Sequence, residues 1–302
     1  MRLNKLLLLP LFIALFSVSC DKDDDPGAEV IPPRDRGEQE IADQAALQEY
    51  LDTHYYNYED FQNPPAEFDY TIKIDTINAA NADKTPLSAS PDLESKVFNY
   101  QGVDYTLYIL KVREGAAEQP KPKFSDSTFV AYEGSLLNRT VFDTSRNPVW
   151  FDLTRTVAGF GQAMTEFRGA SGFEILPDNT VKWNNDFGIG AMFLPSGLAY
   201  FNGPQPTIPS YSPLVFTFKL YGVNEADHDN DGVPSWMEDI NGDQRVENDD
   251  TDGDGIPNYV DRDDDGDFIP TREEISDEDG NIIIPYPDST GDGTPNYLDK
   301  NN

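Results

Sequence analysis

The sequence contains almost none of the residues on which covalent and metal-dependent catalysis usually depends. Its 302 residues include a single cysteine, Cys20, and two histidines, His54 and His228. One cysteine cannot form an intrachain disulfide, and two histidines do not supply a His-based catalytic triad or a zinc cluster. Glycine-rich patterns that bind dinucleotides or phosphates are also missing. The sequence therefore argues against nucleotide-dependent enzymes, and it implies no redox or energy cofactor.

Basic residues are scarce as well. There are 22 Lys and Arg residues against 55 Asp and Glu residues, which gives a formal net charge of -33. Such a charge repels nucleic acid and anionic membrane surfaces, and the acidic excess is concentrated after Asp227. Hydrophobic residues make up 38% of the chain, which is enough for one good core, and the length allows about two domains.

The N-terminus has the pattern of a secretory signal. Arg2 and Lys5 accompany an apolar run of residues 6–18, which is too short for a comfortable membrane span. We therefore assign residues 1–19 to a signal peptide. The run is followed by Cys20, as in bacterial lipoprotein signals, in which the cysteine is lipidated and becomes the mature N-terminus. The alternative is an ordinary cleaved signal followed by an incidental cysteine.

The segment 20–37 behind this cysteine is acidic and rich in proline. Lys22 followed by aspartates resembles the surface-export signal of Bacteroidetes lipoproteins. This resemblance implies an outer-membrane lipoprotein, anchored through Cys20, that can be exposed at the cell surface. The same composition also fits a solvated tether, because it cannot bury enough apolar surface to fold. The two interpretations are compatible.

Residues 38–96 form an N-terminal segment to which we assign no chemistry. An amphipathic helix is predicted from Glu38 to Tyr55, because apolar residues recur on one helical face. These residues are Ile41, Ala45, Leu47, Leu51 and Tyr55. An alternating run predicts one strand, and it consists of Phe68, Tyr70, Ile72 and Ile74.

A series of short motifs runs from residue 130 to residue 220. They are V-x-Y-x-G-x-L from Val130 to Leu136, F-D-T-S from Phe142 to Ser145, V-A-G-F from Val157 to Phe160, P-S-G-L-A-Y from Pro195 to Tyr200, and L-x-F-x-F-x-L from Leu214 to Leu220. In this order the motifs resemble the FKBP family of peptidyl-prolyl cis–trans isomerases. With the lead-in strand of that family, which starts at Val97, the resemblance covers residues 97–223.

The residues of this region also predict its fold. The apolar residues of the last motif alternate with Val215, Thr217, Lys219 and Tyr221, which is the period of a sheet with one buried face. A short helix is expected from Gly161 to Arg168, and the sheet would curl against it. The predicted fold class is α+β, an FKBP-like curved antiparallel sheet or half-barrel around a short helix, followed by an irregular repeat tail.

The resemblance implies catalysis of X-Pro isomerisation. Rotation about this bond has a barrier of roughly 18–20 kcal/mol, because the C–N bond has partial double-bond character. No bond is broken, so neither a nucleophile nor a metal is required. A catalyst needs an apolar pocket that removes water from the amide and a few donors that favour the twisted state. The resemblance implies a pocket of Tyr132, Phe142, Asp143, Phe151, Val157, Phe160, Tyr200 and Phe216.

The same resemblance implies individual roles in this pocket. Phe160 would form the floor, where the family more often has Trp. Asp143 and the Tyr200 hydroxyl would be polar contacts, and the Val157 backbone N–H would donate to the bound peptide. The competing interpretation is that these aromatic residues belong only to the core, because Phe, Tyr and Val are common in any half-buried strand.

The sequence departs from the family pattern at three places. The usual Asp-Gly of the first hairpin is Asn138-Arg139, residues 170–190 are inserted before the next strand, and the corner Ala199–Gly203 is extended. We expect the two insertions to narrow, widen or cap the site. They leave open a rival function, a binding module that keeps the fold without turnover and holds a proline-containing partner.

The acidic region after Asp227 contains a repeat. Carboxylates at alternate positions, a glycine at position 6 and an acidic residue at position 12 follow the spacing of an EF-hand-type calcium loop. Alternate carboxylates in a tight turn bring hard oxygens onto one ion, and Ca²⁺ takes about six to eight of them. We therefore predict that residues 227–302 bind Ca²⁺ as a structural ion.

The predicted ligands belong to regular and looser loops. The regular loops contain Asp227, Asp229, Asp231 and Glu238; Asp250, Asp252, Asp254 and Asp261; and Asp288, Asp292 and Asp299. The looser loops contain Asp239, Asn241, Asp243 and Asp250; and Asp263, Asp265, Asp267 and Glu274, with Phe268 in place of the glycine. No long amphipathic helices flank these loops, and the pattern resembles thrombospondin type 3 repeats. The alternative is a solvated, disordered acidic tail.

These features together predict a lipid-anchored isomerase that acts on exposed X-Pro bonds of envelope or secreted proteins without a catalytic cofactor. Its partners would be proline-containing clients and the membrane that holds the anchor at Cys20. No nucleic-acid partner is expected. A second rival function makes the calcium repeats the main activity, as a calcium-dependent surface spacer or adhesion element.

Overall fold

The computed structural model describes residues 32–301. The predicted signal peptide, the predicted lipidation site Cys20 and most of the 20–37 tether lie outside the described residues. The chain from Arg34 onward forms one compact unit. In this part of the chain, no helix combines the length and the apolar character needed to cross a bilayer.

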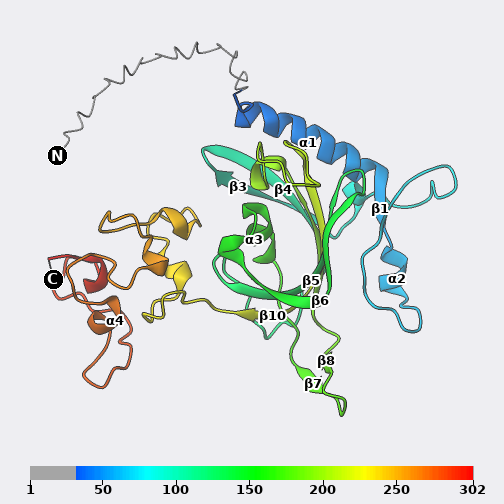
Figure 1. Cartoon of the computed structure of the whole chain (residues 1–302). Coiled ribbons are helices and arrows are strands. Elements are labelled where there is room, and N and C mark those ends of the chain that lie inside the picture. Colours follow the sequence, from blue (N-terminus) through cyan, green and yellow to red (C-terminus); the bar gives the residue numbers. More distant parts are fainter. Residues whose placement is uncertain (1–31, 302) are drawn as a thin grey trace, which may run out of the picture. The chain divides into compact units, whose positions relative to one another are not determined.

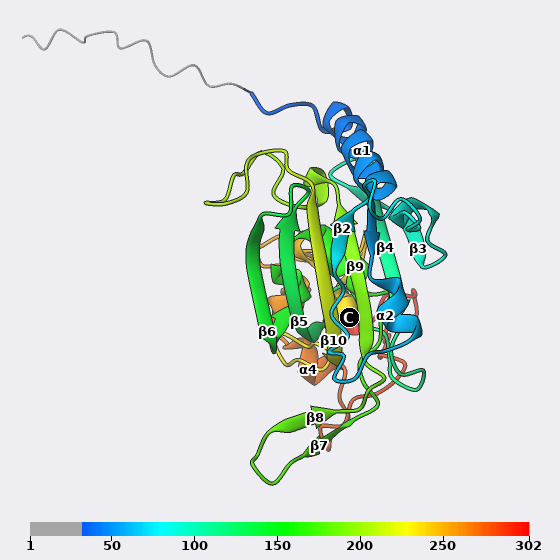
Figure 2. The same cartoon turned by 90° about the vertical axis from the view of Figure 1, so that its right-hand side faces the viewer.

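The centre of the fold is a six-stranded antiparallel sheet with the order β3-β4-β9-β10-β5-β6, seen with its strands side by side in Figure 2. The strands are β3 (Leu93–Tyr100), β4 (Val103–Arg113), β5 (Ser127–Leu136), β6 (Val141–Asp152), β9 (Gly188–Leu194) and β10 (Leu214–Asn224). The predicted α+β class is confirmed. The sheet begins at Leu93, before the expected domain boundary at residue 97.

A short helix, α3 (Ala158–Met164), lies inside the curve of the sheet (Figure 1). The main core forms between this helix and the sheet, and the predicted alternation along β10 supplies Leu214, Phe216, Phe218 and Leu220 to it. The helix lies earlier in the chain than the expected span 161–168. It ends because the backbone N–H groups of Glu166 and Phe167 make tighter i→i+3 hydrogen bonds.

The opposite face of the sheet is partly covered by α1 (Arg36–Thr53) and by the chain that follows it, including Tyr56 and Ile72, so the expectation of a single buried face was wrong. The buried apolar residues of α1 are Leu47, Tyr50 and Leu51. They belong to a second core that also contains Val215 of β10, which is only 2% exposed. The predicted apolar face of the helix was wrong in its first half, because Ile41 is 74% exposed and Ala45 is also exposed.

The first half of α1 is held by polar contacts instead. Asp43 is buried, and its Oδ2 accepts hydrogen bonds from the backbone N–H of Ser196 at 2.7 Å and from the Ser196 hydroxyl at 2.6 Å. Glu40 Oε1 accepts a hydrogen bond from the Thr106 backbone N–H at 3.0 Å. A buried polar group is tolerated when it is hydrogen-bonded, and these partners explain why acidic residues face the sheet here.

Glu40→Gln is expected to raise stability at about pH 8 and to change it little near pH 4.5. Burial is the largest cause that raises the pKa of Glu40 from 4.5 to about 7. Because the folded pKa is the higher one, the stabilisation is complete below the unfolded pKa and is lost as pH rises through the folded pKa. Gln keeps an acceptor for Thr106 without the charge, so the gain should be about 2 kcal/mol. Urea unfolding at both pH values measures it, and equal free energies of unfolding at the higher pH would contradict the prediction.

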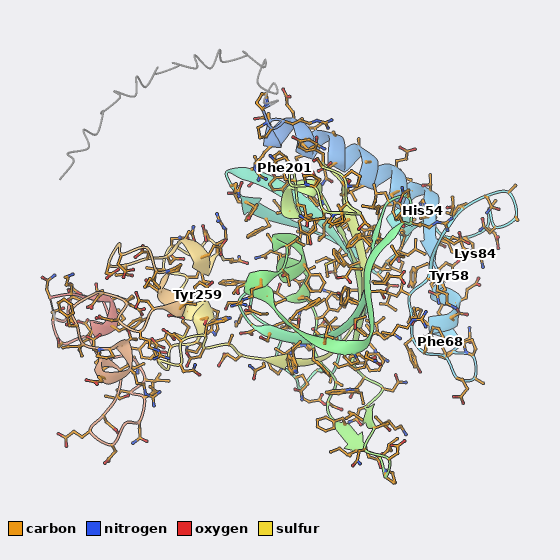
Figure 3. The ribbon with its side chains drawn as sticks, in the orientation of Figure 1. His54, Tyr58, Phe68, Lys84, Phe201 and Tyr259 are labelled. Atoms are coloured by element: carbon orange, nitrogen blue, oxygen red, sulfur yellow. The ribbon has the colours of Figure 1, made fainter. Side chains whose placement is uncertain are left out.

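The chain between α1 and β3 forms only short elements. They are β1 (His54–Tyr56), α2 (Tyr58–Gln62), β2 (Ile74–Thr76) and the 3₁₀ turn η1 (Leu87–Ala89), with β1 and β2 paired. The strand predicted over residues 68–74 was wrong except at its last residue. Tyr70 has a φ of 58°, in the left-handed region that interrupts an extended run. Its ring packs 5.0 Å from that of Phe68, which Figure 3 labels near α2.

Most of the expected insertion 170–190 forms a hairpin of β7 (Phe173–Ile175) and β8 (Val181–Trp183), whereas its last residues, 188–190, already belong to β9 of the main sheet. The hairpin projects from the end of the sheet away from α1 (Figure 1). Phe173 and Ile175 are exposed on it, so this insertion adds an apolar surface element.

The chain after β10 forms a tail of turns and very short helices. These are η4 (Ser235–Glu238), η5 (Val246–Asn248), η6 (Asn258–Val260), α4 (Thr271–Glu274) and η7 (Asn296–Leu298). The tail has a small core of its own, in which Val233, Ile275 and Tyr297 are buried. The described part of the tail thus contains no long helix beside its loops.

Candidate functional site

An open cleft of about 860 Å³ lies on the concave side of the sheet. All eight pocket residues named from the sequence line it: Tyr132, Phe142, Asp143, Phe151, Val157, Phe160, Tyr200 and Phe216. They come from β5, β6, α3 and the residue just before it, β10, and the chain after η3 (Ser196–Leu198). The curvature of the sheet therefore brings distant motifs together in one place.

The aromatic rings of the cleft form a continuous series of contacts. Tyr132 lies 4.9 Å from Phe151, measured between ring centroids, and Phe151 lies 5.6 Å from Phe160. Phe216 then contacts both Phe160 and Phe142 edge to face, at 5.4 and 5.5 Å. Such edge-to-face pairs are favourable beyond the area they bury, so the series forms a fixed apolar wall.

The depth of these residues differs. Phe160 is only 2% exposed and forms the bottom of the cleft, whereas Tyr200 is 40% exposed at its rim. Gly134 on β5 leaves the room that the rings need, because a Cβ there would lie 2.6 Å from Phe142 and 2.8 Å from Phe216. This close approach explains the glycine of the first motif.

Polar and charged side chains also line the cleft, among them Asp143, Asp152 and Arg155. The Tyr132 hydroxyl donates a hydrogen bond of 2.6 Å to Asp143 Oδ2. Burial, and then this carboxylate, raise the pKa of Tyr132, so the phenol stays protonated and remains a donor near neutral pH. Val157 immediately precedes α3, and its backbone N–H donates to no acceptor of the described residues. That N–H is free to meet a ligand.

One wall of the cleft was not predicted from the sequence. It is formed by residues Gln205–Ile208 of the segment that follows the extended corner. Gln205 and Ile208 pair through backbone hydrogen bonds of 2.9 and 3.1 Å. The segment is held from α1, since the Arg36 guanidinium lies 4.1 Å from the ring centre of Phe201, which Figure 3 labels below that helix. We call residues 199–211 the strap.

The two sequence insertions thus have different outcomes. The extended corner belongs to the strap, and within the corner only Tyr200 lines the cleft, whereas Phe201 and Asn202 do not. The hairpin β7-β8 contributes no residue to the cleft lining. Trp150 and Arg155 also line the cleft. Trp150 and Arg155 lie between the quoted motifs, so the motifs did not predict that they line the cleft.

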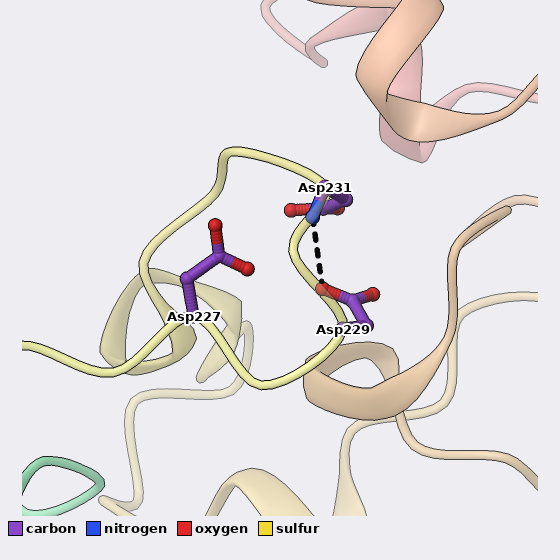
Figure 4. A group of neighbouring side chains, drawn as sticks. All are labelled: Asp227, Asp229 and Asp231. Atoms are coloured by element: carbon purple, nitrogen blue, oxygen red, sulfur yellow. Dashed lines mark hydrogen bonds between the residues drawn. The ribbon is translucent and has the colours of Figure 1, made fainter.

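The acidic tail brings many of its predicted ligands together. Carboxylate oxygens lie within 4.8 Å of one another in the groups Asp227, Asp229 and Asp231; Asp250, Asp252 and Asp254; and Asp263, Asp265 and Asp267. Figure 4 shows the first group on one turn of the chain, with the Asp231 backbone N–H donating to Asp229. This arrangement points carboxylates toward a common centre.

Two further groups contain residues that sequence reasoning missed. Asp249, and not Asp250, lies with Asp239 and Asp243. Asp264 lies with Asp231 and Glu238. Asp249 and Asp264 are each adjacent in sequence to a position of the repeat. The repeat spacing therefore did not identify them as ligands.

Several predicted ligands are not gathered into a carboxylate group among residues 32–301. They are Asp261, Glu274, Asp288, Asp292 and Asp299. Asp288 and Asp299 nevertheless share the Thr290 hydroxyl, at 3.3 and 3.4 Å. The amide Asn241 accepts a hydrogen bond from the Asp243 backbone N–H at 2.9 Å.

All five loops contain the same hydrogen bond from a backbone N–H to a side-chain carboxylate. The N–H at position 6 donates to the carboxylate at position 1, as from Gly232 to Asp227 at 3.1 Å. The corresponding donors in the other loops are Gln244, Gly255, Phe268 and Gly293. Each of these residues has a positive φ, which suits glycine and costs other residues free energy.

Phe268→Gly is therefore expected to stabilise the tail by about 0.5–1 kcal/mol. Phe268 has a φ of 77° and is 93% exposed, so its ring contributes little burial to offset the backbone strain. Thermal unfolding in calcium measures the gain. Phe268→Ala is the matched control, because it removes the ring and keeps the Cβ. An equal gain in the alanine variant would contradict the backbone explanation.

Comparison with known proteins supports the isomerase resemblance in part. The chain is 28% identical over 176 residues to the FKBP-type peptidyl-prolyl cis–trans isomerase FkpA of Aeromonas hydrophila. This chain is similar to FKBP-type isomerases. The match covers 53% of this chain and 57% of FkpA, so the chain spans little more than half the length of that relative.

Similar solved structures include a peptidyl-prolyl isomerase from Pseudomonas syringae, at 22% identity and a TM-score of 0.34, which covers 46% of this chain and 85% of that one. FkpA from Escherichia coli matches at 24% identity with a TM-score of 0.34, covering 45% and 54% of the two chains. In the acidic tail, residues 228–287 match the family model described as BamM C-terminal. The isomerase similarity and this family match are thus separate findings.

Proposed function

We propose that the chain is a peptidyl-prolyl cis–trans isomerase that acts in the aromatic cleft. The observation that carries the proposal is the convergence of the eight residues named from the motifs on one apolar cleft. The similarity to FkpA supports the same activity. Asp143, Tyr132 and Tyr200 line the cleft and would be the polar side chains that contact the peptide, and none of them is needed as a nucleophile.

The cleft would act by changing the surroundings of the amide. A prolyl ring would enter between Phe142, Phe151 and Phe216, above Phe160. Removal of water weakens the resonance of the C–N bond, because the charge-separated form loses its solvation. The Val157 N–H and the Tyr200 hydroxyl would then donate to peptide carbonyls in the twisted geometry. Only contacts that are stronger in the twisted state than in either planar state accelerate rotation.

The cis-to-trans rate of a short X-Pro peptide, measured with the purified chain, tests this proposal. We expect acceleration that is lost when a macrolide that fills FKBP pockets is added. A folded protein that gives no acceleration would overturn the proposal.

A second candidate is a module that binds proline-containing segments without turnover. Two observations favour it: the Asp143 carboxylate is already engaged by Tyr132, and the strap supplies an additional wall to the cleft. Peptide binding measured by calorimetry, with no acceleration of the isomerisation rate, would select this candidate.

We propose further that the tail binds Ca²⁺ as a structural ion. The residues fit this ion, because buried oxygens of Asp227, Asp229 and Asp265 have no hydrogen-bond partner among the described residues, and hard carboxylate oxygens suit Ca²⁺. The ions would supply positive charge to the loops and take no part in isomerisation. The rival function is that the tail itself is the main activity. It would then act as a calcium-dependent surface spacer or adhesion element.

The sequence motifs before the described residues complete this proposal. Lipidation of Cys20 would hold the chain at the outer membrane, where secreted or envelope proteins with exposed X-Pro bonds would be its clients. Mass spectrometry of the mature N-terminus tests the anchor. An unmodified Cys20 in membrane-fractionated protein would overturn it.

A further inference from the structure

Along the chain, the first acidic loop is residues 227–238 and the fourth is residues 263–274. These two loops meet through buried carboxylates. Glu238 closes the first loop, and Asp264 belongs to the fourth loop, far along the chain. Together with Asp231 they form a group in which one oxygen from each side chain lies within 4.8 Å of the others. The exposed fractions are 0% for Glu238, 1% for Asp264 and 2% for Asp231. These are among the least exposed acidic side chains of the described residues.

Most oxygens of this group have no hydrogen-bond partner among the described residues, and the exception is Asp231 Oδ1, which accepts a hydrogen bond from the Val233 backbone N–H at 2.7 Å. Both oxygens of Glu238, both of Asp264 and Oδ2 of Asp231 lack a hydrogen bond among the described residues. Buried polar groups in folded proteins are nearly always satisfied, and an unsatisfied one calls for an explanation such as an ion. A cation bound by one oxygen of each side chain would give these carboxylates a partner.

We propose that Asp231, Glu238 and Asp264 bind a Ca²⁺ ion that joins the first loop to the fourth. The inference rests on the proposed calcium binding and adds a site that the loop spacing does not contain. Asp231 also belongs to the group with Asp227 and Asp229, so its carboxylate would bridge this ion and the ion of the first loop. A single divalent ion would leave most of the negative charge of these side chains uncompensated.

The geometry and the donor types fit Ca²⁺. Oxygens bound to one Ca²⁺ at roughly 2.3–2.6 Å lie no more than about 5 Å apart, which agrees with the spacing of the group. Carboxylates without thiolate or imidazole do not favour zinc or copper. The nearby His228 is engaged elsewhere, with Nδ1 2.8 Å from the Ser235 hydroxyl and Nε2 3.4 Å from Asp152.

Other contacts between the two loops place the ion at a junction of the tail. Arg262 Nε donates to the Asp229 carbonyl at 3.1 Å. Val233 of the first loop packs with Ile275, which follows α4, and with Tyr297 near the end of the chain. The ion would therefore fix a small core that is formed by segments distant in sequence. We call this ion the clasp ion.

If the clasp ion is present, substitution of its ligands should change the number of bound calcium ions in a specific way. Bound calcium is counted by mass spectrometry after dialysis of the purified chain against buffered free calcium, and amide hydrogen exchange is followed in residues 227–238 and 263–275. Asp264→Asn and Glu238→Gln should each lower the count by one ion and speed exchange in both segments. Asp254→Asn, in the exposed loop, is the control: it should lower the count without changing exchange in either segment.

The outcomes separate this inference from the calcium proposal. If the unsubstituted chain binds no calcium, calcium binding itself fails. If it binds calcium but Asp264→Asn keeps the full count and the protection of both segments, only the clasp ion fails. It also fails if Asp254→Asn speeds exchange in both segments as much as Asp264→Asn does.

A variant whose tail unfolds can still be interpreted. If Asp264→Asn releases every ion, a tenfold increase in free calcium should restore the remaining ones by mass action. The count should then return to one ion below that of the unsubstituted chain. Recovery of the full count would overturn the clasp ion. Slow exchange in β5 and β10 in the same samples reports that the sheet is intact.

Discussion

Phe142→Ala is expected to lower kcat/KM for an X-Pro peptide about 100-fold, while lowering the free energy of unfolding by only about 1–2 kcal/mol. Phe142 is half-buried and packs edge to face on Phe216 at the side of the cleft. Its loss would let water reach the bound amide and would remove a wall that positions the prolyl ring. The isomerisation rate and urea unfolding of the same protein measure the two effects.

Phe61→Ala is the matched control for this prediction. Phe61 is also half-buried and packs edge to face, 5.0 Å from Phe68, but it belongs to the other face of the sheet and does not line the cleft. It should lose a similar amount of stability and keep the rate. If both variants lose activity in proportion to stability, the aromatic residues are core residues only, and the catalytic interpretation is wrong.

Removal of calcium is expected to unfold the tail and leave the sheet folded. Without ions, the buried carboxylates of the loops repel one another and have no partners, whereas the small tail core contributes little burial. The two cores of the sheet contain no residue beyond Val223. Metal removal should therefore abolish the tail's protection against proteases without lowering that of β5 or β10.

Limited proteolysis in EGTA, analysed by mass spectrometry, measures this effect. We expect rapid cuts after residue 224 and a resistant fragment that ends near that position, while calcium protects the whole described chain. Addition of Mg²⁺ at the same concentration is the control and should not restore protection, because Mg²⁺ requires smaller, near-octahedral sites. A tail that resists proteases equally in EGTA would show that calcium is not what holds it together.

The sequence predicted best those features that short-range patterns encode. The alternation along β10 predicted the side that packs in the main core with α3, and the resemblance to FKBP-type isomerases implied the residues that line one cleft. The strap wall was missed, because its position depends on tertiary contacts with α1, such as that between Arg36 and Phe201. No local pattern in residues 205–208 reports such a contact.

The errors have equally specific causes. The face of α1 was wrong because apolar periodicity does not register buried acids such as Asp43, whose partner Ser196 is distant in sequence. The strand over residues 68–74 was wrong because Tyr70 adopts a left-handed backbone. Asp264 was missed because its neighbours Asp231 and Glu238 belong to another repeat. In each case a contact between residues distant in sequence, or an unusual backbone conformation, overrides the pattern of the neighbouring residues.

The buried hydrogen bonds between Asp43 and Ser196 connect α1 to the motif region. Residues 97–223 alone are therefore not expected to fold as this structure does. A chain that began at Val97 would lose α1 and the first residues of β3, and it would expose Leu110, Phe193 and Val215 to water. It would also free the strap from its anchor at Arg36. The segment before the motifs therefore completes the second core and anchors the strap, so it and the motif region are one folding unit.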